Sequence, residues 1–189
     1  MAVADDEFAE RLKLKLAPET VGVALIRAGA FLTGYELVKA SILEGVRDFF
    51  LTGFDVHEGK TYSQSYQLKV LPLGKNPFDA SLAWLVQNDA LTAAQAAALD
   101  SSREHRHEVA HELARFLVDV DADVDVERLR TLHGIMRSLD RFWGSIEVDI
   151  DPDFDGVEVD RDHIRSGSGA LFEYLMQVAG LGESAPPGS

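Results

Sequence analysis

The sequence predicts an all-α protein, a helical bundle with a long first bundle helix and an irregular middle insertion. Three observations support this class. Apolar residues recur at helical spacing through most of the chain, N-capping residues or proline stand where those segments begin, and few segments alternate as a strand would. With 189 residues and 46% apolar content, the chain is long enough for one domain with a core. We therefore expect a single domain over residues 1–181 and a disordered tail over 182–189.

The first third of the chain predicts two helices. One runs from about Asp5 to Leu16 and ends before Pro18. The Pro18-Glu19-Thr20 opening suits a second helix, because proline is favoured in the first turn and an acid is favoured at the positive end of the dipole. Apolar residues at helical spacing extend that helix from Val21 to about Phe54, a length of roughly 50 Å. It would be the backbone of the bundle.

The middle of the chain is less regular. Residues 55–77 are polar and punctuated by glycine and proline, with a short apolar run from Leu68 to Leu73, and this pattern predicts a long loop with one extended piece. Two short helices follow, over Phe78 to Gln87 and over Thr92 to Leu99, the second capped by Thr92.

The last third predicts three more helices. Asp100-Ser101-Ser102 supplies N-cap chemistry for a helix that runs to about Val118. A further helix, from Val126 to about Trp143, carries a regular apolar stripe, and a last one covers roughly Ser168 to Val178.

Composition bounds the function. The chain has no cysteine, which removes disulfides, thiolate metal sites and cysteine nucleophiles and fits a reducing compartment. The first ten residues lack the pattern of a secretion signal, and the longest apolar stretch, Val21 to Gly34, is interrupted by Arg27 and is too short to span a bilayer. We expect a cytoplasmic protein with no membrane association.

The formal charge of −14 opposes a broad nucleic-acid surface, because phosphate contacts normally come from a basic surface. The acids gather mainly between Asp119 and Asp162, however, whereas Ser101 to Arg115 contains three arginines and three of the six histidines. A local basic site on an acidic protein is therefore expected, and a broad basic groove is not.

That local segment contains the most informative motif of the chain, Arg106-His107-Glu108-Val109-Ala110-His111-Glu112. From His107 it matches H-E-x-x-H, in which His107 and His111 would bind zinc and Glu108 would be the general base. The metzincin extension would need glycine at 114 and histidine at 117, where this chain has Ala114 and Leu117. No convincing third ligand follows, so zinc hydrolysis stays the weaker interpretation.

The geometry of a helix divides the motif into three faces. Val109, Leu113, Phe116 and Leu117 would face the core. Arg103, Arg106, His107 and His111 would share a neighbouring face, on which Ala110 and Ala114 keep the surface low. The glutamates and Arg115 would be solvated, and His105 would lie at the edge of the core as a structural histidine.

From Arg106 the same segment is R-x4-H with a polar residue directly after the arginine, and it resembles the signature of the HEPN superfamily. The resemblance covers most of residues 18–145: a long apolar first bundle helix, a variable middle segment, the motif near the start of a late helix, and another bundle helix. It implies a HEPN-like up-and-down helical bundle. Many members of that superfamily are metal-independent ribonucleases, in which arginine and histidine from two subunits meet across a dimer interface.

By that resemblance the protein would be a homodimeric endoribonuclease that needs no cofactor. It would act as a toxin or effector of a bacterial defence or toxin–antitoxin module, with an antitoxin or defence protein as partner. Arg106 would stabilise the charge on the phosphate, His111 would be general acid or base, and His107 would orient the phosphate. Arg103 would support substrate binding. A non-catalytic HEPN-like dimerisation or partner-binding module is the alternative, and the zinc hydrolase is a second one.

A calcium-like pattern lies further along the chain. Asp151, Asp153, Asp155 and Gly156, with Asp162 at position twelve, match D-x-D-x-D-G. An aspartate at position twelve reaches less far than the usual glutamate, and no clear helix precedes the loop. A solvated acidic loop is the favoured interpretation, with a bound cation as the alternative.

Overall fold

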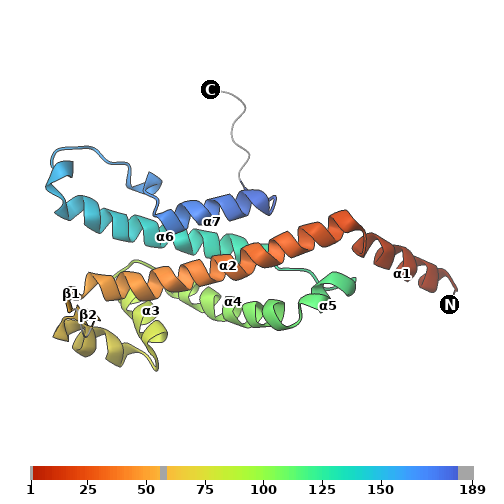
Figure 1. The fold of residues 1–189 in the computed structure, drawn as a ribbon, viewed down its shortest axis with the longest axis horizontal. Coiled ribbons are helices and arrows are strands. Elements are labelled where there is room, and N and C mark those ends of the chain that lie inside the picture. Colours follow the sequence, from red (N-terminus) through yellow and green to blue (C-terminus); the bar gives the residue numbers. More distant parts are fainter. Residues whose placement is uncertain (1, 56–58, 183–189) are drawn as a thin grey trace.

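The computed structural model describes residues 2–55 and 59–182, and it is mostly helical. Figure 1 shows the arrangement. The helices are α1 (Ala2–Lys15), α2 (Pro18–Phe49), α3 (Pro77–Gln87), α4 (Ala93–His111), α5 (Leu113–Val118), α6 (Val126–Ile150) and α7 (Gly167–Val178). The all-α class is therefore confirmed. Of the tail predicted over 182–189, residues 183–189 lie outside the described part.

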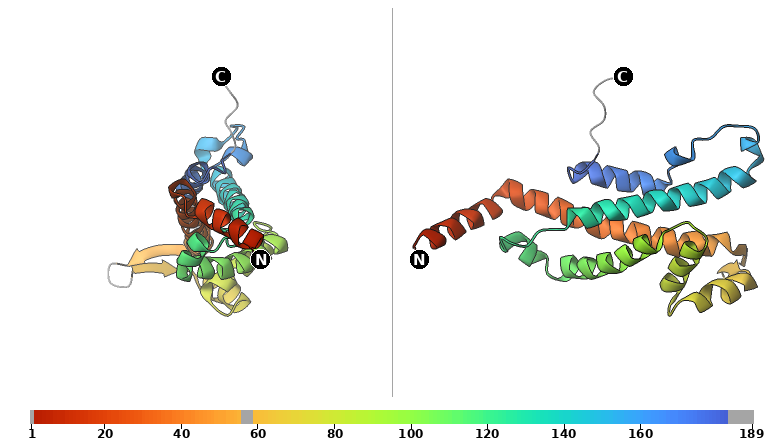
Figure 2. Two further views of the ribbon diagram at one scale, coloured as in Figure 1. Left: turned by 90° about the vertical axis from the view of Figure 1, so that its right-hand side faces the viewer. Right: turned by 180° about the vertical axis from the view of Figure 1, so that it is seen from behind.

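The central element is α2, which packs against α6, α3, α4 and α7. The long helices alternate in direction, with α2 and α6 running one way and α4 and α7 the other, as Figures 1 and 2 show. The apolar stripes of α2 and α6 form the middle of the core, where the largest fully buried side chains include Phe31, Val38, Ile42, Leu129, Leu132, Ile135, Met136 and Leu139. Burial of this apolar stripe, rather than helix propensity, stabilises the long helices.

Two glycines let neighbouring elements approach α2 closely. A Cβ at Gly34 would lie 2.6 Å from the ring of Phe172 on α7, and one at Gly45 would lie 2.7 Å from the indole of Trp143 on α6. The indole of Trp143 in turn stacks on Trp84 of α3, with ring centroids 6.3 Å apart. Close packing of α3, α6 and α7 onto α2 thus depends on small residues at these two points.

The segment that follows α2 differs from the prediction. The helix ends at Phe49, and an antiparallel hairpin of β1 (Leu51–Asp55) and β2 (Gly59–Tyr62) follows it. The strands project to one side of the bundle in the left view of Figure 2. The extended piece within residues 55–77 is β2, and the residues after it form a π-helical turn (Tyr66–Val70) and a 3₁₀ turn (Leu71–Leu73).

The motif helix also differs from the prediction. Thr92 caps it as expected, in a reciprocal capping box with Gln95, but a single helix then continues from Ala93 to His111. Asp100, Ser101 and Ser102 therefore lie inside the helix rather than at a new N-terminus. The helix ends at His111, with Glu112 as its C-cap before the separate α5, so the predicted continuation to Val118 is wrong. Helices α3 and α7 lie within one residue of their predicted ends.

One described helix, α2, bears on the expectation that the chain does not associate with a membrane. Over 18 residues α2 reaches a mean hydropathy of 1.4, so by length and composition it could cross a membrane. The central helix of a soluble bundle meets the same criterion. The contacts that α2 makes with four other long elements are those of a core helix.

Short polar contacts hold α1 and the acidic loop before α6 together. The ammonium group of Lys15, which is nearly buried, donates to the carbonyl of Ala122 at 2.7 Å and to the carboxylate of Asp123 at 2.6 Å. Arg11 pairs with Asp121 at 2.5 Å. These contacts direct part of the acidic segment toward α1.

Candidate active site

Helix α4 presents its motif side chains on an exposed face. Val109 is fully buried, and Phe116 of α5 is 4% exposed, so the predicted core face of the motif is confirmed at these two positions. His107, Ala110 and His111 are exposed, and Arg106 is half-buried. The helical spacing therefore brings Arg106, His107 and His111 to one accessible surface.

The two histidines of that surface lie against each other. The imidazole rings of His107 and His111 have centroids 4.3 Å apart, with an angle of 52° between their planes. His111 is the last residue of α4, where cations are favoured by the helix dipole. Both rings are accessible to a ligand from solvent.

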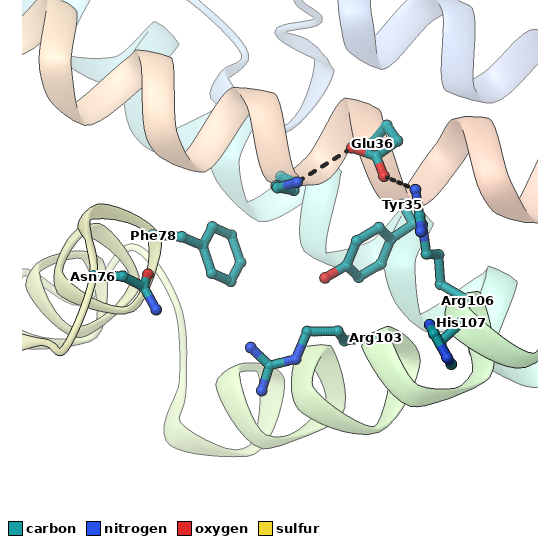
Figure 3. A pocket seen from close by; sticks show the side chains of 8 residues that line it. Tyr35, Glu36, Asn76, Phe78, Arg103, Arg106 and His107 are labelled. Atoms are coloured by element: carbon teal, nitrogen blue, oxygen red, sulfur yellow. Dashed lines mark hydrogen bonds and ion pairs between the residues drawn. The ribbon is translucent and has the colours of Figure 1, made fainter. Parts of the chain in front are cut away.

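Arg106 is held by an acid from another helix. Its guanidinium donates to Glu36 of α2 at 2.9 Å, and the same carboxylate lies 3.5 Å from the ammonium group of Lys39. Figure 3 shows Glu36 on α2 reaching toward Arg106. The Nε of Arg106 is buried and has no hydrogen-bond partner among the described residues. Arg106 thus reaches the surface from a partly desolvated position, where its charge acts more strongly than in water.

A hollow of about 360 Å³ opens beside Arg106, and we call it the α2–α4 hollow. It is lined by Tyr35, Glu36, Lys39, Asn76, Phe78, Arg103, Arg106 and His107. Figure 3 shows the guanidinium of Arg103 and the rings of Tyr35 and Phe78 at this hollow. Burial raises the pKa of the Tyr35 hydroxyl above its ordinary value, and the nearby Arg103 and Arg106 act in the opposite direction. The phenol is therefore neutral at physiological pH and can donate a hydrogen bond.

His105 has a structural environment. It is 8% exposed and packs between Phe31 and Phe116, with ring centroids at 4.8 and 5.8 Å. Its Nε2 accepts the backbone N–H of Asp125 at 3.1 Å, so in the neutral ring the proton is on Nδ1. That nitrogen lies 3.5 Å from Glu108. The expected structural histidine at the core edge is confirmed.

This contact bears on the zinc interpretation. Glu108, the general base of an H-E-x-x-H site, faces His105 rather than the pair formed by His107 and His111. Within residues 2–55 and 59–182, no group of three or more His, Asp or Glu side chains is close enough to hold a metal ion. The histidine pair therefore lacks a third donor among the described residues of its own chain.

The carboxylates of the calcium-like loop are likewise not brought together in the described part of the chain. Asp151 caps the 3₁₀ turn Pro152–Phe154 and accepts the N–H of Asp153 at 3.0 Å. Asp162 instead pairs with Arg141 of α6 at 3.1 Å. The pattern Asp151, Asp153, Asp155 and Asp162 thus forms a solvated acidic loop.

Sequence reasoning missed five residues beside the motif, namely Tyr35, Glu36, Lys39, Asn76 and Phe78. Three of them are on the predicted first bundle helix. The only local signal was a glutamate and a lysine one turn apart in an otherwise apolar segment, which is also the pattern of an ordinary solvated face.

No protein-family model, no curated protein and no solved structure matches this chain. The resemblance to HEPN proteins therefore rests on the R-x4-H motif and on the order of the helices in this chain.

Proposed function

We propose that the protein is a metal-independent endoribonuclease of HEPN type, with a composite site formed where the α4 surfaces of two copies meet. The observation that carries the proposal is that Arg106, His107 and His111 share one accessible face of α4, with the two imidazoles 4.3 Å apart. This face combines a phosphate-binding fork with groups that transfer protons near neutral pH.

In the proposed reaction the 2′-hydroxyl of the substrate attacks the adjacent phosphorus. His111 either removes the proton of the 2′-hydroxyl or delivers a proton to the departing 5′-oxygen, and water completes the other transfer. Arg106 stabilises the negative charge that grows on the phosphate oxygens. His107 orients the phosphate. The bond to the 5′-oxygen breaks, so the products are a 2′,3′-cyclic phosphate and a free 5′-hydroxyl. These steps require no metal ion.

The surroundings of the motif support this chemistry over zinc hydrolysis. Glu108 faces His105, away from the histidine pair, and the described residues supply no third metal donor there. The biological role that the resemblance implies, a toxin or effector of a bacterial defence or toxin–antitoxin module in the cytoplasm, is part of the same proposal. An antitoxin or defence protein would then be the partner.

The test is cleavage of mixed cellular RNA by wild type, Arg106→Ala and His111→Ala, each with and without EDTA. Arg115→Ala is the control, because Arg115 lies on α5 and pairs with Glu112 on the outer surface. We expect cleavage that survives EDTA, persists in Arg115→Ala, falls at least about a hundredfold in the other two variants, and leaves 2′,3′-cyclic phosphate ends.

Light scattering of the same samples tests the composite site, which requires a dimer. Activity that EDTA abolishes and zinc restores would contradict the proposal and favour the zinc hydrolase that uses His107 and His111. Wild-type protein that is dimeric but leaves RNA intact would also contradict it and favour a partner-binding module.

A further inference from the structure

We propose that the α2–α4 hollow binds one nucleotide of single-stranded RNA beside the cleaved phosphate, with the base on Phe78 and the preceding or following phosphate on Arg103. This inference rests on the proposed ribonuclease function and names the part of the substrate that its site holds.

The hollow has the size and position of a ligand subsite. Its volume of about 360 Å³ lies in the usual range for small-molecule sites, about 300–1,000 Å³. It shares Arg106 and His107 with the proposed catalytic face, and Arg103 lies one helical turn before Arg106 on α4. A strand bound at Arg106 would therefore extend directly into the hollow.

The charges of the hollow favour a phosphate. Lys39, Arg103 and Arg106 line it against one carboxylate, that of Glu36, on a chain whose formal net charge is −14. Arg103 also pairs with Asp100 at 3.1 Å, but both side chains are more than half exposed, so a phosphate displaces this contact at little cost. Arginine presents parallel N–H groups that match phosphate oxygens.

The aromatic side chains favour a nucleotide, which carries a base, over an anion that has no aromatic ring. Phe78 is half-buried at the start of α3, and its ring faces the hollow together with Tyr35 in Figure 3. Bases of single-stranded nucleic acids stack on such rings, whereas paired bases in a duplex have no free faces. The combination of a ring with nearby guanidinium groups thus points to a single strand rather than to a duplex or an acidic peptide.

The test measures binding without cleavage. A fluorescein-labelled octamer of 2′-O-methyl RNA cannot be cut, because the attacking hydroxyl is blocked, and its affinity is measured by fluorescence anisotropy. Phe78→Leu and Arg103→Gln are compared with Phe154→Leu and Arg115→Gln. The two arginines are well matched, since each is 54% exposed and pairs with a carboxylate three residues earlier. Phe154 is 37% exposed on a distant turn.

We expect Phe78→Leu to raise the Kd about fivefold or more, as loss of one stacked base does. Arg103→Gln should raise the Kd and reduce the slope of log Kd against log salt by about 0.7, the value for one phosphate contact on a single strand. Both controls should stay within about twofold of wild type. Thermal melting of each variant separates loss of binding from loss of folding. If Phe78→Leu does not fold, Arg103→Gln, which changes an exposed position, still tests whether the hollow binds the RNA.

Several outcomes would overturn the inference. The first is that wild-type protein does not bind the octamer, and the second is that the variants in the hollow bind it as the controls do. The inference would also fail if an acidic peptide of the same charge bound equally well, or if free adenosine monophosphate competed as strongly as unlabelled octamer. The two proposals fail separately. Binding that depends on the hollow without cleavage of unmodified RNA would refute the nuclease, whereas cleavage that requires Arg106 but ignores Phe78 and Arg103 would refute the subsite.

Discussion

Glu36 of α2 and Arg106 of α4 form a hydrogen-bonded ion pair at 2.9 Å that joins two helices across 70 positions of the sequence. Both side chains are between a third and a half exposed. Such a pair contributes little to stability, at most about 1 kcal/mol. Its main effect is on the arginine, because the carboxylate occupies one of the N–H groups that a phosphate could use and offsets part of the positive charge.

We therefore expect Glu36→Gln to tighten binding of the uncleavable RNA octamer about fivefold. The amide oxygen can still accept the hydrogen bond from Arg106, while removal of one negative charge about 4 Å from a phosphate is worth about 1 kcal/mol. The melting temperature should change little. Glu44→Gln, at an exposed position two turns further along α2, is the control and should bind like wild type. Weaker binding by Glu36→Gln would show that the charged carboxylate assists substrate binding.

A second prediction concerns stability and follows from the packing of α7 on α2. Gly34→Ala should lower the free energy of unfolding by about 1–3 kcal/mol, because the new Cβ would lie 2.6 Å from the fully buried ring of Phe172, which must shift. Gly29→Ala is a matched control in the same helix, where a Cβ meets nothing within 4 Å. It should raise the free energy of unfolding by about 0.5–1 kcal/mol, since alanine favours the helix. Urea denaturation followed by circular dichroism measures both. A stabilising Gly34→Ala would contradict the close approach of α7.

The sequence predicted the helices whose start and stop signals are local, and it failed where tertiary packing decided. Helix α2 ends at Phe49 without a glycine or proline stop, and the next residues, including Leu51 and Phe54, continue the apolar spacing. The sequence therefore predicts helix where β1 forms, and a loop where β2 forms. At Ser101, the hydroxyl donates to the carbonyl of Ala98 at 3.1 Å, so a residue typical of an N-cap bonds within a continuing helix.

The candidate site was predictable only in part, for a related reason. Arg106, His107 and His111 lie within one helix, so their shared face follows from helical periodicity. Glu36 and Phe78 reach the same place from α2 and α3, and no spacing in the sequence encodes the contact between those helices. A motif thus indicates the chemical groups, and the folded chain adds the residues that modulate them.

A third prediction concerns stability and follows from the contact between α1 and the acidic loop before α6. Lys15→Met keeps the length of the side chain but removes the bonds to the carbonyl of Ala122 and to Asp123. Because Lys15 is only 9% exposed, we expect a loss of about 1–2 kcal/mol in the free energy of unfolding, measured by urea denaturation. Lys13→Met, on the same helix at an exposed position, should change it by less than about 0.5 kcal/mol. Equal effects of the two substitutions would show that α1 is not held by Lys15.

The last prediction concerns how stability depends on pH, and it follows from the buried carboxylate of Asp140. Asp140 is 4% exposed on α6 and accepts a hydrogen bond from Ser166 at 2.6 Å, and its second oxygen has no hydrogen-bond partner in the described part of the chain. Burial raises the pKa of this carboxyl above its ordinary value, while the bond from Ser166 and the charge of Arg165 lower it and Glu173 raises it further. The raised pKa means that the folded state binds the proton more tightly than the unfolded chain. The stability that this proton confers is therefore complete below the unfolded pKa and is lost as the pH rises through the folded one.

Asp140→Asn removes the charge and retains an oxygen that can accept from Ser166. We expect the melting temperature of the variant, relative to that of wild type, to increase as the pH rises from about 4 to 7. The reason is that only wild type must bury an ionised group at the higher pH. The difference between the two proteins is the quantity to follow, since the other carboxylates titrate in both. Asp149→Asn, in which the lost carboxylate is exposed and the pKa is lowered by Arg161, should show the opposite trend. A variant at 140 that loses stability relative to wild type as the pH rises would instead mean that the N-terminus of α7 stabilises the ionised carboxylate.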